Sequence, residues 1–176
     1  MLDQTIGWCG KLPTNPDFIQ SHVFPDIEHT LLNWIATGQN HIGEQLLAQP
    51  YEYNMPHFYY FLNTSLTTHK IRGLLFKSFD QRGRPCPFIF FTFDQEISSK
   101  NLFINFFEKF KIFNFNLNML NVKLSQQDVL EQLIKNKDHH GIDQPDYWVE
   151  LYPQYKNIEL KVEKTNHIVF RKLILR

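Results

Sequence analysis

The chain has 176 residues, of which 43% are hydrophobic and 20% charged, so it is long and apolar enough to bury a core without disulfides or metal ions. Its 18 basic and 18 acidic residues balance, which excludes a protein whose overall charge attracts nucleic acid or a membrane surface. The first residues lack the basic and apolar regions of a signal peptide, and no stretch is apolar enough to span a bilayer. With only two cysteines, Cys9 and Cys86, these features predict a cytoplasmic protein with one domain over residues 1–176.

Charge is unevenly placed along the chain. From Met1 to Pro56 there is one basic residue, Lys11, against six acidic residues, whereas Gln154 to Arg176 holds six basic and two acidic residues. Such segments are compatible with solvated or mutually facing surfaces, and also with a polar docking face. The sequence leaves both interpretations open.

The N-terminal part is predicted to form a strand, a loop and a helix. Ile6 to Trp8 is the short strand, and a loop rich in Gly and Pro follows it. From Phe24 to Ile35, apolar residues recur at three- and four-residue steps, which is typical of a helix with one buried face. Pro25 and Asp26 suit its first turn, because Pro loses no needed hydrogen bond there and a carboxylate meets the positive end of the helix dipole.

The end of this helix is less well defined by the pattern. Apolar residues resume from Ile42 to Leu47, and Pro50 is predicted to end the helix. Gly38 and Gly43 each destabilise a helix by about 1 kcal/mol relative to Ala. An interruption near Thr37 to Asn40 is therefore a second possibility.

Three strands are predicted next, at His57–Leu62, Ile71–Phe79 and Cys86–Phe93. The second and third form a hairpin, because Asp80 suits the first position of a turn and Gly83 supplies a positive φ. Both strands are almost continuously apolar, which predicts a sheet covered on both faces. The prolines at positions 85 and 87 cannot donate ladder hydrogen bonds, so that part of the third strand is expected at a sheet edge or a bulge.

The C-terminal half is predicted to contain two helices and three strands. Ser98 or Ser99 caps a helix with a stripe of Phe residues, and Ser125 begins a second helix. The strands are Tyr147–Leu151, Ile158–Val162 and His167–Leu173. The order of elements predicts an α+β fold, with a mainly antiparallel sheet carrying helices on both faces as an α-β-α sandwich.

Three segments contain residue types used in catalysis or metal binding, and none has the spacing that the chemistry needs. GWCGK at residues 7–11 is not a phosphate-binding loop, because only two residues separate its glycines and Leu-Pro follows the Lys. His139 and His140 have no obvious complementary ligands elsewhere, so a solvated loop is the simpler interpretation. Cys9 and Cys86 lie among aromatic residues and Pro, which favours buried, unreactive thiols over nucleophiles. No cofactor or metal ion is predicted.

The charged residues of the two Gly- and Pro-containing segments have two interpretations of similar weight. Asp80, Arg82 and Arg84 lie close together in the hairpin, and Asp17 follows the first loop. They either brace the two loops through turn and ion-pair contacts or form a polar patch for a protein partner.

The same segments resemble one family, the type VI secretion system-associated protein TagF, also called ImpM. Its members begin with Gly-x-x-Gly-Lys-Leu-Pro, a polar spacer and Gly-Asp-Phe, matched here by Gly7, Gly10, Lys11, Leu12, Pro13, Thr14, Asp17 and Phe18. A later Gly-x-Leu-x-Pro-Ser-x-Asp-x-x-Gly-Arg-x-x-Pro pattern is matched by Gly73, Leu75, Ser78, Asp80, Gly83, Arg84 and Pro87. The chain departs from the family at Pro16, where Gly is usual, and at Lys77, where Pro is usual. The resemblance extends from about Ile6 to Phe93.

The resemblance implies a cytoplasmic, non-enzymatic repressor of type VI secretion that binds and sequesters the system's forkhead-associated (FHA) scaffold protein. It also implies an α-β-α sandwich. As a hypothesis, two loops form or support the docking face, and their residues are Lys11, Leu12, Pro13, Asp17, Phe18, Asp80, Arg82 and Arg84. The alternatives are a structural component of the secretion apparatus and, less favoured, a small hydrolase-type enzyme with Asp17, Asp80 and Arg84 in its pocket.

Overall fold

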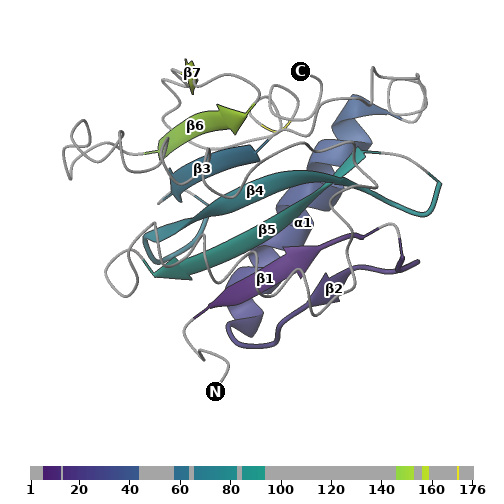
Figure 1. Cartoon of the computed structure of the whole chain (residues 1–176). Coiled ribbons are helices and arrows are strands. Elements are labelled where there is room, and N and C mark those ends of the chain that lie inside the picture. Colours follow the sequence, from purple (N-terminus) through teal and green to yellow (C-terminus); the bar gives the residue numbers. More distant parts are fainter. Residues whose placement is uncertain are drawn as a thin grey trace.

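The structure is a computed structural model that describes residues 6–12, 14–43, 58–63, 66–82, 85–93, 146–152, 156–158 and 170. These residues form one antiparallel sheet with a long helix, α1, against one of its faces (Figure 1). The helix is Pro25–Ile42. The strands are β1 (Gly7–Gly10), β2 (Ile19–Gln20), β3 (Phe58–Asn63), β4 (Ile71–Phe79), β5 (Pro85–Phe93), β6 (Asp146–Tyr152) and β7 (Lys156–Ile158).

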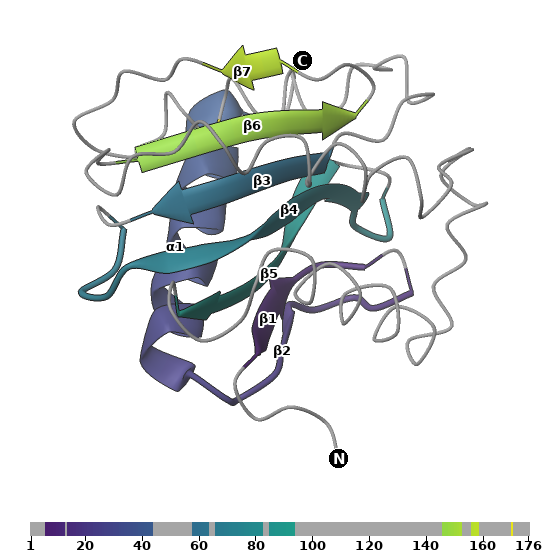
Figure 2. The same ribbon diagram turned by 60° about the vertical axis from the view of Figure 1, so that its left-hand side comes forward.

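The seven strands lie in the order β2-β1-β5-β4-β3-β6-β7, and every neighbouring pair is antiparallel. Figure 2 shows that α1 runs across the strands on one side of the sheet. An antiparallel sheet with a packed helix confirms the predicted α+β class. The predicted helices that begin near Ser98 and Ser125 lie outside the described residues, so the second helical layer stays a prediction.

Helix α1 forms where the periodic apolar pattern predicted it. Pro25 occupies the first turn, and the carboxylates of Asp26 and Glu28 lie in that turn as well. The buried side chains of Ile27, Leu31, Trp34 and Ile35 face the sheet and form the core with residues of β1, β4 and β5.

The end of α1 differs from the main prediction, and the interruption considered near Thr37 to Asn40 is absent. The helix runs without interruption through Gly38 and ends at Ile42 rather than at Pro50, because Gly43 caps it with φ 80° and donates its N–H to the Gln39 carbonyl at 3.1 Å. Gly38 is tolerated because the ring of Phe170 lies against it. A Cβ at position 38 would be 2.2 Å from Cγ of Phe170, closer than any real contact.

The β4–β5 hairpin is confirmed, with continuous pairing from Ile71 opposite Phe93 to Phe79 opposite Pro85. Strand β5 lies inside the sheet, but its pairing with β1 stops at Phe88. The prolines at 85 and 87 therefore have β4 on one side and no β1 partner on the other, which explains how the sheet accommodates them.

Both faces of the central strands are buried, as the apolar sequences predicted. Leu75 and Ile89 belong to the core beneath α1. On the opposite face, Phe76 and Phe90 are also buried, at 0% and 1% exposure. The sequences of these strands are continuously apolar because the side chains on both faces of the sheet are buried away from water.

The remaining strand predictions have mixed outcomes. Strands β3 and β6 confirm the predictions at 57–62 and 147–151. Strand β7 is Lys156–Ile158, which overlaps the predicted strand Ile158–Val162 at one residue, and residues 159–162 lie outside the described residues. The predicted strand His167–Leu173 is wrong at Phe170, which is helical and packs edge-on against Trp34 with ring centroids 5.2 Å apart. A short apolar run does not distinguish a strand from a buried helical turn.

Candidate partner-binding site

Pairing of β1 with β5 brings the two predicted loops to the same end of the sheet. Gly10, the last residue of β1, lies opposite Phe88, and Lys11 begins the first loop directly after it. The second loop, which joins β4 to β5, ends at Pro85. Both loops project on the right-hand side of Figure 1. Segments about seventy residues apart in the sequence therefore form one surface region.

The first loop is closed by a turn and by a cation–ring contact. Asn15 donates its N–H to the Leu12 carbonyl at 3.0 Å, and Leu12 itself is buried in the core. The ammonium of Lys11 lies 4.9 Å from the centroid of the Phe18 ring. Asp17 is exposed. Leu12 thus supports this loop from below, while Lys11, Asp17 and Phe18 reach its surface.

The second loop is organised by a buried carboxylate. Asp80 is 5% exposed, and its Oδ1 accepts the backbone N–H of Arg82 at 2.8 Å, which is the geometry of an Asx turn. The Arg82 side chain is exposed. The other two predicted site residues, Pro13 and Arg84, lie outside the described residues.

The buried thiol of Cys86 lies between the two loops. Burial raises its pKa to about 12, and the carboxylate of Asp80 acts in the same direction. The ammonium of Lys11 and a hydrogen bond from Gln39 act in the opposite direction. Burial also raises the pKa of Cys9. Both thiols are therefore held protonated near neutral pH, which agrees with the inert role predicted for them.

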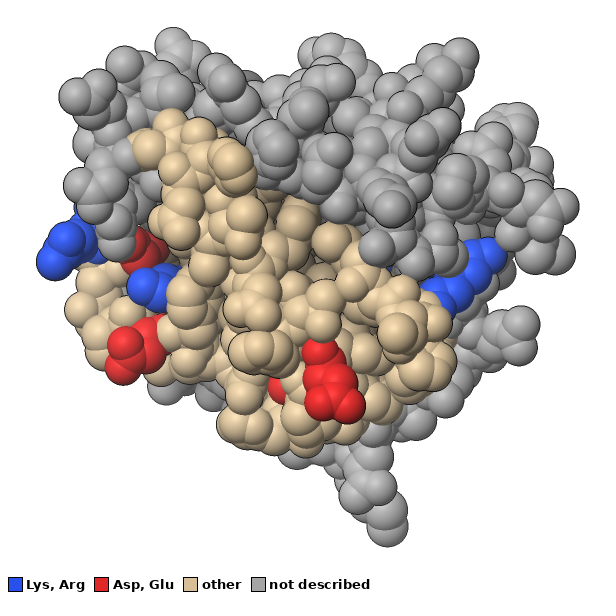
Figure 3. All heavy atoms as spheres, turned by 180° about the vertical axis from the view of Figure 1, so that it is seen from behind, with Lys and Arg blue, Asp and Glu red and all other residues tan. Residues whose placement is uncertain are grey.

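The charged groups at this edge carry both signs. Viewed from behind, the left edge of the molecule places Lys or Arg side chains beside Asp or Glu side chains (Figure 3). The described charged residues of the two loops are Lys11, Asp17, Asp80 and Arg82. A partner surface with complementary charges of both signs fits such a mixed edge better than a polyanion does.

A buried glutamate that the sequence did not reveal organises the segment between β2 and α1. Glu28 is 0% exposed, and its carboxylate accepts the backbone N–H groups of His22 at 2.8 Å, Val23 at 3.2 Å and Phe24 at 3.1 Å. It also accepts the hydroxyl of Ser21. These donors satisfy the buried charge and also the orphan amides that precede the helix.

The same network reaches β1. Ser21 donates its N–H to the Trp8 carbonyl at 2.9 Å, and its hydroxyl oxygen accepts the Trp8 N–H at 3.2 Å. His22 has φ 60°, a left-handed conformation that is uncommon for a residue with a side chain. Glu28 therefore fixes a sharp change of direction between β2 and α1. Ser21 and Glu28 match no local capping motif, so no sequence signal identified them.

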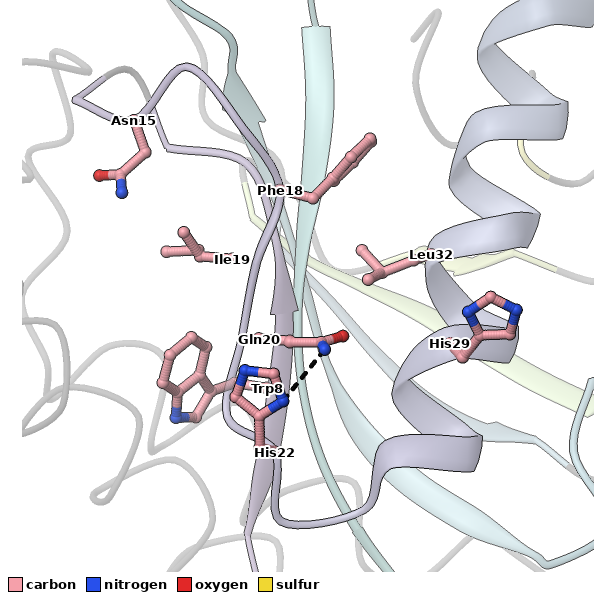
Figure 4. Close-up of a pocket in the computed structure, with 8 residues that line it drawn as sticks. All are labelled: Trp8, Asn15, Phe18, Ile19, Gln20, His22, His29 and Leu32. Carbon is pink, nitrogen blue, oxygen red and sulfur yellow. Dashed lines mark hydrogen bonds between the residues drawn. The ribbon is translucent and has the colours of Figure 1, made fainter.

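An open groove of about 630 Å³ lies beside β2 and α1. Figure 4 shows its lining residues, which are Trp8, Asn15, Phe18, Ile19, Gln20, His22, His29 and Leu32. None of them is an Asp, Glu, Lys or Arg. Nε2 of Gln20 donates to Nδ1 of His22 at 3.1 Å. Phe18 links this groove to the first loop, so the groove and the loops form one continuous region.

Within the part of the chain that the structure describes, no group of three or more His, Cys, Asp and Glu side chains is arranged to hold a metal ion. The predicted metal candidates, His139 and His140, lie outside that part. Among the described residues, no helix combines the length and the apolar character needed to cross a bilayer.

Comparison with known families identifies the group to which these loops belong. A family model described as the TagF N-terminal domain, type VI secretion system-associated, matches residues 7–136. The chain belongs to this family. The match includes both loops and confirms the resemblance drawn from their motifs. TagF membership thus associates this chain with type VI secretion.

Among solved structures, the crystal structure of PA0076 from Pseudomonas aeruginosa PAO1 is similar, with a TM-score of 0.43 and 19% sequence identity. The similarity covers 61% of this chain and 53% of that one, so this chain spans about half the length of PA0076. No curated protein matches the sequence.

Proposed function

We propose that this TagF-family protein is a cytoplasmic repressor of a type VI secretion system that acts by binding and sequestering the forkhead-associated (FHA) scaffold protein, without catalysing a reaction. Family membership supports the link to type VI secretion. The repressor activity and the FHA partner follow from the family resemblance and are the parts that need a test.

The observation that carries the proposal is the meeting of the two family motifs at one end of the sheet. The loop from Lys11 to Phe18 and the turn from Asp80 to Arg82 come together because β1 pairs with β5. The surface of these loops presents the exposed Arg82, the Phe18 ring and Lys11. Arg and aromatic side chains contribute strongly to protein interfaces, and charged side chains contribute to charge complementarity.

Buried groups fix the backbone of both loops before any partner binds. Leu12 anchors the first loop in the core, and the Asp80 carboxylate fixes the backbone at Arg82. A preformed loop loses less conformational entropy on binding than a flexible one, so this support favours a recognition surface.

Calorimetric titration of the purified protein with the purified FHA scaffold protein tests the proposal. We expect a saturable complex that weakens about tenfold for the charge reversals Asp17→Lys and Arg84→Glu, since close charge pairs at interfaces contribute on the order of 1.4 kcal/mol or more. The control is Thr37→Lys, which adds a charge at an exposed position of α1 about two turns beyond the groove residue His29 and should leave the affinity unchanged.

Two outcomes contradict the proposal. If the wild-type protein does not bind the scaffold and instead co-purifies with assembled sheath or baseplate, it is a structural component. If the scaffold binds but the charge reversals leave the affinity of correctly folded protein unchanged, the two loops are structural and the docking face lies elsewhere.

A further inference from the structure

Strand β2 is the outermost strand of the described sheet, and its outer backbone groups face away from β1. Ser21 donates its N–H to the Trp8 carbonyl, so the backbone at Ser21 points inward. Backbone direction alternates along a strand, and the N–H and C=O of Gln20 therefore point outward, as do those of Phe18. The pair Cys9–Gln20 is accordingly a non-hydrogen-bonded pair of the β1–β2 ladder.

The end of this edge is held rigidly. The Glu28 carboxylate binds the amides of His22, Val23 and Phe24, and the left-handed φ of His22 turns the chain away directly after Ser21. The outward groups of Phe18 and Gln20 are thus presented on a short, fixed, extended segment. Pre-organisation of this kind lowers the entropic cost of adding a strand.

Side-chain contacts are available on both faces of β2. In Figure 4, Phe18 and Gln20 lie on the side of β2 that faces Leu32 of α1, whereas Trp8 and Ile19 lie on the other side. A strand placed beside β2 would alternate its own side chains between these two sides. Each side offers at least one large apolar group to such a strand.

The electrostatic surroundings favour a basic partner segment. The groove lining carries no Asp, Glu, Lys or Arg, so apolar and uncharged side chains fit inside it. Two exposed carboxylates are neighbours of its lining residues along the chain: Asp17 directly precedes Phe18, and Asp26 lies one helical turn before His29. The ammonium of Lys11 lies over the Phe18 ring and offsets Asp17 at that end. The preference for a cation therefore rests on Asp26.

We propose that β2 accepts an extended segment of a partner protein by β-strand addition, with alternate apolar side chains in the groove and a Lys or Arg beside Asp26. Main-chain hydrogen bonds to Phe18 and Gln20 supply affinity, and the groove supplies selectivity. The inference rests on the proposed function in one respect, because it assigns the FHA scaffold protein as the source of the segment.

The decisive pair of variants is Gln20→Pro and Gln20→Ala. Both remove the side chain that contacts His22, but only Pro removes the outward N–H at position 20. The β1–β2 ladder does not use that N–H, and Ile19 already has the extended conformation that a residue before Pro requires. Equal thermal unfolding midpoints for the two variants would establish that both are folded.

Two probes are titrated against each variant: the intact FHA scaffold protein by calorimetry, and a short peptide alternating Val with Lys at up to about 1 mM by amide chemical shifts. We expect Gln20→Pro to bind both probes about tenfold more weakly than Gln20→Ala, which lacks the same side chain and is the reference. A peptide alternating Val with Glu should bind more weakly. If Gln20→Pro does not fold, the test uses the wild-type protein and Val/Lys peptides that are N-methylated at one amide each. Methylation should block binding at every second peptide position and have little effect at the positions between.

The outcomes separate this inference from the proposed function. If the scaffold binds the wild type and Gln20→Pro equally well, strand addition is overturned and the proposed function stands. If the scaffold does not bind but the Val/Lys peptide binds and discriminates between the variants, the proposed function fails and strand addition stands. The inference is overturned if the wild-type protein binds neither peptide or prefers the Val/Glu peptide. It is also overturned if the wild type forms a homodimer that Gln20→Pro dissociates.

Discussion

Asp80 and Glu28 are both buried carboxylates, but they organise their loops over different distances along the chain. Asp80 accepts the N–H of Arg82, two residues further on, within a single turn. Glu28 accepts three backbone amides that precede it by four to six residues, together with the hydroxyl of Ser21. The first arrangement is a local turn, whereas the second joins β2, α1 and, through Ser21, strand β1.

The difference teaches which of these backbone contacts needs a negatively charged acceptor. An Asx turn needs one acceptor oxygen, which an Asn side chain also provides. Four donors converging on Glu28 need both oxygens of an ionised carboxylate, because a Gln side chain would direct its own NH₂ group at some of them. Replacement by the matching amide should therefore separate the two sites.

The largest expected effect is at Glu28. Glu28→Ala leaves three partly buried amides and a hydroxyl without their acceptor and should lower the free energy of unfolding by about 4 kcal/mol. Glu28→Gln keeps the size of the side chain and should lower it by roughly 2–3 kcal/mol. Urea denaturation measures both. A loss below about 1 kcal/mol for either variant would show that the network is not needed for stability.

The next effect is the pH dependence of the free energy of unfolding, which arises because the buried thiol of Cys86 lies beside the Asp80 turn. The pKa of Cys86 is raised from 9.0 to about 12, so below pH 9 the thiol is protonated in both the folded and the unfolded chain. Between pH 9 and 12 the unfolded chain loses this proton and the folded chain keeps it, so stability falls as pH rises, by roughly 3–4 kcal/mol. Cys86→Ala is the control, since it removes this contribution while leaving the titration of Lys and Tyr. Parallel curves of unfolding free energy against pH for the two proteins would refute the prediction.

The smallest effect is at Asp80. For the contact with the Arg82 N–H, Asp80→Asn keeps an acceptor and should cost about 0.5 kcal/mol, whereas Asp80→Ala removes the acceptor from a buried position and should cost roughly 1–2 kcal/mol. Chemical denaturation of the pair gives both values. If Asp80→Asn lowers the free energy of unfolding as much as Glu28→Gln does, the two carboxylates do not differ in their need for negative charge.

Local patterns predicted the parts of the fold that local physics determines. The apolar stripe of α1, its Pro25 start and the β4–β5 hairpin all follow from periodicity and turn chemistry, and each was found. The two-residue strand β2 was missed, since Ile19–Gln20 is too short to show alternation. The sequence left open whether the helix is interrupted near Gly38, because the Phe170 ring that lies against this glycine comes from far along the chain.

The candidate site was predictable only in its separate halves. Family motifs identified the loop from Lys11 to Phe18 and the turn from Asp80 to Arg82, and the hypothesis joined them in one face. Their meeting depends on the β1–β5 pairing, which no local pattern encodes. Glu28 escaped prediction for the same reason, since an acidic residue in a first helical turn ordinarily remains in solvent.

The contact between Gly38 and Phe170 has a consequence for synthesis of the chain. The Phe170 ring can occupy the space beside Gly38 of α1 only after the ribosome has translated residue 170. This happens on the order of ten seconds after the synthesis of α1 itself. Until then the Trp34 ring lacks its edge-on neighbour, so a nascent chain stalled before that point should bind chaperones that a completed chain releases.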